Sequence, residues 1–291
     1  MKDLIGIFDS GAGGLTVLRA MERVMPEKSY LYFGDTARVP YGPRTPKEVE
    51  GFVLEIGDFL VSAGCELILI ACNTATAAGL AALRAASPVP VYGMIEAAAA
   101  AVRDLARSGA NPWPVGLAAT EGTVKSGAYD RAMTVLAQAL ERESGGTMSC
   151  APGFGRLISK GCPRFVSLVE KGVTKGPDAA KVIDEDLREL KAAGIGSLIL
   201  GCTHFPFLAE EIHRYLGQDI SLIDPAEKLA ELVKEEAALR GRTDLDSDTE
   251  GQPAAGMGRR LFYCSGDPGA FQKIGGLLLG RPLDEVRRKT F

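Results

Sequence analysis

Short apolar runs alternate with helix-like stretches along most of the chain, and this alternation restricts the fold more than any other feature. Runs rich in β-branched and aromatic residues predict strands, and apolar residues on one helical face predict helices. Their alternation is typical of a parallel, doubly wound α/β sheet, or of two such sheets. The expected strands are 3–9, 29–35, 67–72, 90–95, 114–119, 197–202, 220–224 and 260–265, and the expected helices are 14–25, 46–63, 75–86, 96–108, 127–143, 178–193, 207–216 and 226–240.

Two local signals in the C-terminal third mark boundaries. Asp224-Pro225-Ala226-Glu227 predicts a helix start, with an N-cap carboxylate, a first-turn proline and a glutamate at the capping-box position. Residues 241–259 carry glycine, proline and acidic residues with no apolar period, which predicts a mobile surface loop without a chemical role.

Size and composition exclude several classes of protein. With 291 residues the chain exceeds the usual size of one domain, so one large or two medium domains are expected. A composition of 46% hydrophobic and 24% charged residues with a net charge of -4 argues against a basic nucleic-acid-binding surface. No apolar run approaches the roughly 18–20 residues that span a bilayer, so we expect a cytoplasmic protein with no membrane partner.

The six cysteines are scattered without paired spacing, so we expect them to be reduced. There is no CxxC motif and there are only two histidines, which argues against a metal site. Burial in the core is the default expectation for a free cysteine, and we apply it to Cys65, Cys150, Cys162 and Cys264.

Two segments 130 residues apart resemble each other: Ile68-Leu69-Ile70-Ala71-Cys72-Asn73-Thr74 and Leu198-Ile199-Leu200-Gly201-Cys202-Thr203-His204. Each is an apolar strand that ends in a small residue, a cysteine and hydrogen-bonding side chains. The carboxyl ends of parallel strands open onto the ligand crevice, so these segments predict two facing half-sites. A core-filling cysteine would not need such polar neighbours.

Two opposed thiols suit one kind of chemistry. A lone catalytic cysteine attacks a carbonyl and needs a base such as histidine, whereas a thiolate and a thiol on opposite faces of a carbon can remove a proton and return one with inversion. Cys72 and Cys202 are therefore the candidate acid and base. His204 and Asp9 are their candidate helpers, for proton relay or polarisation.

The turn Asp9-Ser10-Gly11-Ala12-Gly13-Gly14 follows the first expected strand and opens a helix. Its glycines allow close backbone approach, and helix N–H groups favour an anion. A dinucleotide fingerprint would need glycine where Thr16 stands, so a small carboxylate ligand is favoured over a nucleotide, with Asp9 meeting an ammonium group and Ser10 hydrogen-bonding. A tight turn with no ligand is the alternative.

Two more loops follow strands and fit the same crevice. Pro40-Tyr41-Gly42 offers backbone amides and a phenol to a ligand carboxylate, although it is also an ordinary turn. Thr120-Glu121-Gly122-Thr123 follows another expected strand and supplies hydroxyls at its end.

Five blocks together resemble the glutamate racemases of the aspartate/glutamate racemase superfamily. They lie in family order over almost the whole chain: Ile7–Val17, Tyr32–Gly42, Ala71–Ala75, Cys162-Pro163 with Phe165-Val166 and Leu168–Glu170, and Gly201–Pro206. Chance agreement of five separated blocks is far less probable than a match to one motif. Glu121 and the 241–259 segment are departures that do not fit the family pattern.

This resemblance implies two similar doubly wound parallel-sheet domains related by a pseudo-twofold, with the active site in the crevice between them. The first domain would be discontinuous, 1–95 plus 225–291, and the second would be 96–224. The expected activity is cofactor-independent racemisation of L-glutamate to D-glutamate for peptidoglycan synthesis, without pyridoxal phosphate or metal. The expected partner is L-/D-glutamate, with no nucleic acid, and a homodimer is left open.

The resemblance also assigns roles to residues. Cys72 would take the α-proton from D-glutamate and Cys202 would take it from the L-enantiomer. Asp35 and Glu170 would support the site. The implied substrate contacts are Asp9, Ser10, Pro40, Tyr41, Gly42, Asn73, Thr74, Thr120, Thr203 and His204.

Three other functions are weighed against this hypothesis. An aspartate racemase or related two-cysteine isomerase would keep both thiols but alter the carboxylate-binding turns, and the Pro40-Tyr41-Gly42 block favours glutamate. A non-catalytic amino-acid-binding module would need neither cysteine. A pyridoxal-phosphate racemase would need a Schiff-base lysine, and neither cysteine motif contains one.

Overall fold

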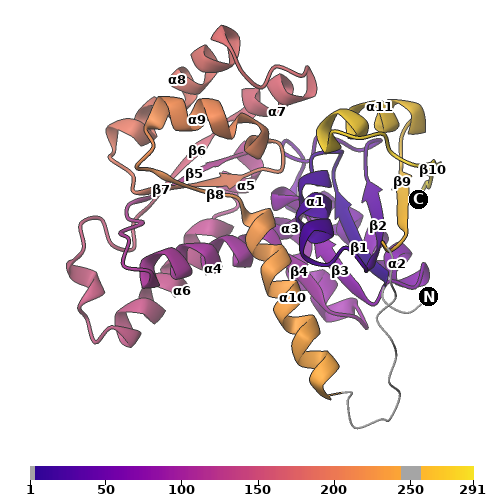
Figure 1. Ribbon diagram of the computed structural model, residues 1–291, viewed down its shortest axis with the longest axis horizontal. Helices are drawn as coiled ribbons and strands as arrows, with labels where there is room; N and C mark the ends of the chain where they lie inside the picture. Colours follow the sequence, from indigo (N-terminus) through magenta and orange to yellow (C-terminus); the bar gives the residue numbers. More distant parts are fainter. Residues whose placement is uncertain (1–3, 244–256) are drawn as a thin grey trace.

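The computed structural model describes residues 4–243 and 257–291 as two lobes (Figure 1). The strands are β1 Leu4–Asp9, β2 Ser29–Gly34, β3 Leu67–Ile70, β4 Val91–Gly93, β5 Val115–Ala119, β6 Leu157–Gly161, β7 Ser197–Gly201, β8 Ser221–Ile223, β9 Arg260–Cys264 and β10 Val286–Arg288. The helices are α1 Leu15–Val24, α2 Pro46–Ser62, α3 Asn73–Ala86, α4 Met94–Arg107, α5 Glu121–Lys125, α6 Ala128–Glu143, α7 Pro163–Glu170, α8 Pro177–Ala192, α9 Ala209–Leu216, α10 Pro225–Thr243 and α11 Pro268–Leu279.

Each lobe is built on a parallel sheet, which confirms the predicted α/β class. The first sheet has the order β10-β9-β2-β1-β3-β4, and the second has the order β6-β5-β7-β8. Its pairings within the described residues are all parallel, as are those of the first. The order β2-β1-β3-β4 in one lobe is repeated as β6-β5-β7-β8 in the other, so β3 and β7 occupy equivalent places. This repeat supports the expected pseudo-twofold.

Side-chain alternation along β1 shows why the first sheet is covered on both faces. Leu4 and Phe8 pack into one apolar cluster with α2 and α3, whereas Ile5 and Ile7 belong to a second cluster with α1 and α11. Because successive residues of a strand point to opposite faces, one apolar run fills both layers.

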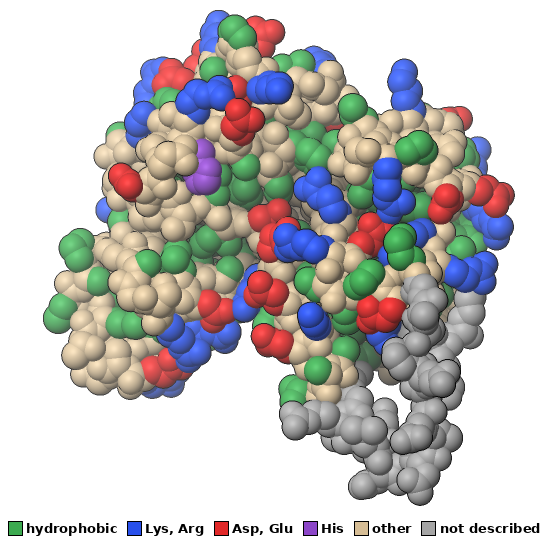
Figure 2. All heavy atoms as spheres, viewed as in Figure 1, with side chains coloured by type: hydrophobic (Ala, Val, Ile, Leu, Met, Phe, Trp, Pro, Cys, Tyr) green, Lys and Arg blue, Asp and Glu red, His purple; other side chains and the backbone are tan. Residues whose placement is uncertain are grey.

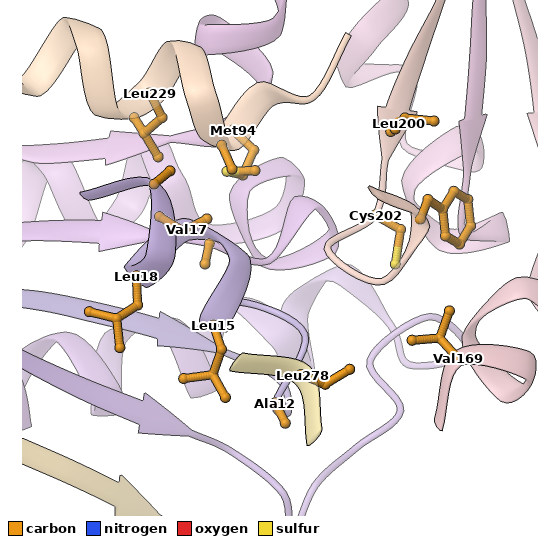
Figure 3. Packing of buried hydrophobic residues seen from close by; sticks show 14 of the residues in the cluster. Ala12, Leu15, Val17, Leu18, Met94, Val169, Leu200, Cys202, Leu229 and Leu278 are labelled. Atoms are coloured by element: carbon orange, nitrogen blue, oxygen red, sulfur yellow. The ribbon is translucent and has the colours of Figure 1, made fainter. Parts of the chain in front are cut away.

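Helix α10 lies between the lobes and packs against α1 of the first and α4 of the second (Figure 1). Leu229 of α10, Met94 of α4 and Val17 of α1 belong to one apolar cluster, and Figure 3 shows them side by side. The chain leaves the first sheet after Gly93 and begins its return at Pro225. We therefore propose the boundaries expected from the sequence, near 95 and 225.

All eight expected strands are present with ends shifted by at most two residues in the described chain, but β6 and β10 escaped prediction. Both lie at sheet edges, where half-burial leaves a weak apolar signal in sequences such as LISKG and VRR. Helices α5, α7 and α11 were also missed. The first two are five and eight residues long, and α11 contains glycines, although Asp267-Pro268 caps its start.

Two expected helix starts can be compared with the structure, and one expected loop largely cannot. The helix expected at 207–216 begins instead with a 3₁₀ turn at Phe205–Leu208 before α9. At the start of α10 the Asp224 carboxylate accepts a bond from Ala226 N at 2.9 Å, which confirms the N-cap, while Glu227 pairs with Arg23 of α1. The loop expected at 241–259 falls largely on residues 244–256, which lie outside the described residues.

Lys and Arg side chains are interspersed with Asp and Glu over the face shown in Figure 2, without a patch of one sign. Within the described residues, no helix is long and apolar enough to cross a membrane.

Replacement of two helix glycines by alanine is expected to change the free energy of unfolding in opposite directions. A Cβ on Gly79 of α3 would meet Val53 of α2 at 2.6 Å, whereas Gly51 of α2 is exposed and has open space around it. We expect Gly79→Ala to lower the free energy of unfolding by about 1–3 kcal/mol through overlap between the helices. The control Gly51→Ala should raise it by about 0.5–1 kcal/mol, since alanine favours a helix. Urea denaturation measures both, and a stabilised Gly79→Ala variant would contradict the tight packing.

Candidate active site

A small cavity of about 60 Å³, partly open to solvent, lies where the carboxyl ends of both sheets face each other. Its lining residues are Asp9, Ser10, Val39, Pro40, Tyr41, Gly42, Cys72, Asn73, Thr74, Thr120, Val166, Glu170, Gly201, Cys202, Thr203 and His204. The structure thus gathers the expected substrate contacts and Glu170 in one place, and their roles stay predictions. Asp35 does not line the cavity. Val39, Val166 and Gly201 do line it, and although they lie in the blocks quoted above, they were not predicted as site residues.

Cys72 stands at the N-cap of α3, directly beyond β3, and its side chain is buried. Its Sγ accepts a bond from Ala75 N at 3.5 Å and donates to Ser10 Oγ at 3.7 Å. Burial, reinforced by the nearby Asp9, raises the pKa of the Cys72 thiol to about 12. This sulfur is therefore a protonated thiol at neutral pH when the crevice holds no ligand.

Cys202 follows β7 and has a different neighbour. Its Sγ lies 3.8 Å from His204 Nδ1, while His204 Nε2 faces Glu170 Oε1 at 3.5 Å. Burial alone would lower the pKa of His204, but the bonds to Cys202 and Glu170 raise it to about 10. The Cys202 sulfur therefore lies beside a positively charged imidazole, which the Cys72 sulfur does not contact.

Asp9 ends β1 and is buried at the floor of the cavity. Its Oδ2 accepts bonds from Gly14 N at 2.9 Å and Gly11 N at 3.3 Å, so amides that we expected to face a ligand anion bind Asp9 instead. Its Oδ1 is buried with no hydrogen-bond partner in the described chain. This oxygen is available to a donor from a ligand.

The glycine-rich turn touches the other lobe. A Cβ on Gly13 would overlap Thr203 Oγ1 and lie 2.7 Å from the His204 ring. Glycine is required here for close approach, as expected for a backbone that lines a ligand site.

Three threonine hydroxyls form a closed cluster between the lobes. Thr74 Oγ1 lies 3.0 Å from both Thr120 Oγ1 and Thr123 Oγ1, and the last two are 2.9 Å apart. Thr120 caps α5 and Thr123 follows three residues later, so the Thr-Glu-Gly-Thr turn supplies two of the three hydroxyls.

Tyr41 corrects one sequence prediction. Its hydroxyl donates to Asp35 Oδ2, so the phenol does not face a ligand carboxylate as expected, although Tyr41 lines the cavity. Asp35 also accepts bonds from Arg38 Nε and Ser265 Oγ, each at 2.7 Å. Asp35 therefore holds the loop behind the cavity, and Ser265, which is 230 residues away in the sequence, could not be linked to it by any local pattern.

The remaining cysteines lie outside the cavity. Cys65, Cys162 and Cys264 are buried as predicted, but Cys150 is exposed, because it lies in a 3₁₀ turn on the surface of the second lobe. Across residues 4–243 and 257–291, no group of three or more His, Cys, Asp or Glu side chains is arranged to hold a metal ion.

Comparison with known proteins gives a consistent result. Residues 11–233 match the family model described as Asp/Glu/Hydantoin racemase. A glutamate racemase of Geobacter metallireducens is 38% identical over 97% of this chain and 94% of its own length.

Two solved structures share the fold over nearly their full lengths. The Thermus thermophilus glutamate racemase in complex with β-chloro-D-alanine has a TM-score of 0.81 and 38% identity, covering 100% of this chain and 98% of its own. The Francisella tularensis glutamate racemase in complex with D-glutamate has a TM-score of 0.78 and 29% identity, covering 98% and 97%.

The raised pKa of His204 predicts a pH-dependent stability. The folded pKa of about 10 lies above the ordinary 6.5, so protonation favours the folded state, fully below pH 6.5 and less as pH rises toward 10. The difference in unfolding free energy between the wild type and His204→Asn should therefore shrink from pH 6.5 to pH 10. Urea denaturation across this range measures it, and a constant or growing difference would contradict the raised pKa.

Proposed function

The chain belongs to the Asp/Glu/Hydantoin racemase family and is an isomerase, and from this premise we propose that it is a glutamate racemase that uses Cys72 and Cys202 as its two bases. One observation carries the mechanism: two cysteines on equivalent strand ends of the two lobes line the same cavity. A two-base racemase requires this placement, because the proton leaves one face of the α-carbon and another arrives on the opposite face.

The two thiols have unequal environments, which suits them to opposite tasks. Cys72, with its pKa raised to about 12, is the acid in the free enzyme and donates its proton to form D-glutamate. Cys202, beside His204, is the base that takes the α-proton from L-glutamate. After one turnover the proton is on Cys202, so the enzyme is ready for the reverse reaction.

The polar groups of the cavity match an amino acid. Asp9 Oδ1 is an acceptor without a partner in the described residues and suits the α-ammonium group. Asn73 Nδ2 is a donor in the same condition and suits a carboxylate, with Thr74 and Thr203 beside it. Pro40–Gly42 also line the cavity, and we place the side-chain carboxylate against their backbone.

The product fits one cellular role. D-Glutamate made by this reaction would supply peptidoglycan synthesis, as the family resemblance implies. A non-catalytic amino-acid-binding module is the second candidate, but binding alone does not require two thiols at equivalent strand ends.

The substrate is tested by circular dichroism of the purified protein with no cofactor added. The signal of L-glutamate should decay to zero as the enantiomers equilibrate. For L-aspartate, which is one methylene shorter, we expect a kcat/KM about 10–200-fold lower. Faster conversion of aspartate would assign the chain to the other substrate, and no conversion of either would favour a binding module.

The two-thiol mechanism is tested by single substitutions. Because positioned acid–base groups contribute about 10²–10⁴-fold, Cys72→Ala and Cys202→Ala should each lower kcat for glutamate by at least that range. The control Cys150→Ala removes an exposed thiol outside the cavity and should leave kcat unchanged. If Cys202→Ala racemised glutamate at nearly the wild-type rate, a one-base site would replace this proposal.

A further inference from the structure

Tyr129 is a buried phenol near the cavity that the proposed chemistry does not use. It lies in the first turn of α6 and is 1% exposed. Its ring packs in the apolar cluster of the second lobe with Val115 and Met133. The residue before α6, Gly127, has a φ of 63°, a left-handed conformation that glycine adopts readily and that turns the chain from α5 into α6. The ring therefore has little freedom to move.

The hydroxyl of this tyrosine reaches across to the first lobe. Tyr129 Oη donates to Asn73 Oδ1 at 2.7 Å. Burial, with Cys202 and Asp224 nearby, raises the pKa of Tyr129, so the phenol keeps its proton and stays a donor.

This bond decides which end of the Asn73 amide faces the cavity. Asn73 begins α3 next to Cys72, is 3% exposed and lines the cavity. A carboxamide can be turned end over end with little change of shape, so its orientation is set by its partners. With Oδ1 held by Tyr129, Nδ2 is left toward the cavity, and it is buried without a hydrogen-bond partner in the described chain.

We propose that Tyr129 is a positioning residue, which holds Asn73 so that its amide donor, and not its oxygen, meets a carboxylate of the substrate. The proposal rests on the proposed function. Tyr129 does not line the cavity and acts only through Asn73. If the amide turned over, Nδ2 would donate to Tyr129 Oη, and the phenol proton, whose acceptor among the described residues is Asn73 Oδ1, would be buried without one, at a cost of about 1–3 kcal/mol.

The same bond joins the two lobes. Asn73 belongs to the first lobe and Tyr129 to the second, so the amide is oriented only when the lobes are together. The orientation of the amide donor and the placing of Cys72 and Cys202 in one cavity therefore depend on the same packing of the lobes.

The test is the variant Tyr129→Phe, which keeps the ring and removes the hydroxyl. We expect KM for L- and D-glutamate to rise about tenfold, the loss of one hydrogen bond to a charged group, while kcat changes by less than about threefold because both thiols are untouched. The matched control is Tyr30→Phe. Tyr30 is also 1% exposed, and its hydroxyl donates to the carbonyls of Met21 and Met25, away from the cavity. It should lower stability without changing KM.

A double-mutant cycle separates positioning from general damage. If Tyr129 acts through Asn73, Tyr129→Phe should change KM by less than about twofold in an Asn73→Ala background. Additive effects, or a wild-type KM in Tyr129→Phe, would overturn the proposal. Failure of the wild type itself to racemise glutamate would instead overturn the proposed function.

A second variant, Asn73→Asp, tests the proposal if Tyr129→Phe does not fold. Asn73→Asp retains an acceptor for the phenol but replaces the amide donor with a second carboxylate oxygen. It should raise KM at least as much as Asn73→Ala does. A KM for Asn73→Asp equal to that of the wild type would show that the amide nitrogen is not the donor, and the proposal would be wrong.

Discussion

The site depends on how closely the backbones of the two lobes approach each other. A side chain on Gly13 would collide with Thr203 and with the His204 ring, and a Cβ on Gly122 would lie 2.5 Å from the carbonyl oxygen of Gly42. These glycines allow contact across the crevice on two sides. Because bulkier residues would hold the lobes apart, the glycines set the width of the cavity in which both cysteines lie.

The repeated strand order places the two cysteines at equivalent strand ends, but the side chains around each cysteine differ. Cys72 is beside Ser10 and close to Asp9, whereas Cys202 is beside His204. The carboxylate near Cys72 disfavours a charge on that sulfur, whereas the sulfur of Cys202 lies beside a positively charged imidazole. Symmetry of the backbone with asymmetry of the charges is what an acid and a base on opposite faces of one carbon require.

Much of this could be predicted from sequence, for physical reasons. Strands such as β1 are covered on both faces and carry a strong apolar signal, and a residue just beyond a parallel strand must lie at the crevice, which placed Cys72 and Cys202. Edge strands such as β6 carry little of that signal. The apolar pattern also does not predict where a polar side chain points. The hydroxyl of Tyr41 donates to Asp35, and the hydroxyl of Tyr129 donates to Asn73, 56 residues away in the sequence.

Two buried polar atoms without hydrogen-bond partners in the described chain belong to residues that line one cavity: Asp9 Oδ1 and Asn73 Nδ2. Each costs about 1–3 kcal/mol while it lacks a hydrogen bond, so this part of the protein is less stable than a fully paired core would be. One is an acceptor and one a donor, which is the complement of an ammonium and a carboxylate on one small molecule. A bound amino acid would therefore supply the hydrogen bonds that these buried atoms lack. The hydrogen bonds that orient these atoms matter because they decide whether a donor or an acceptor faces the ligand.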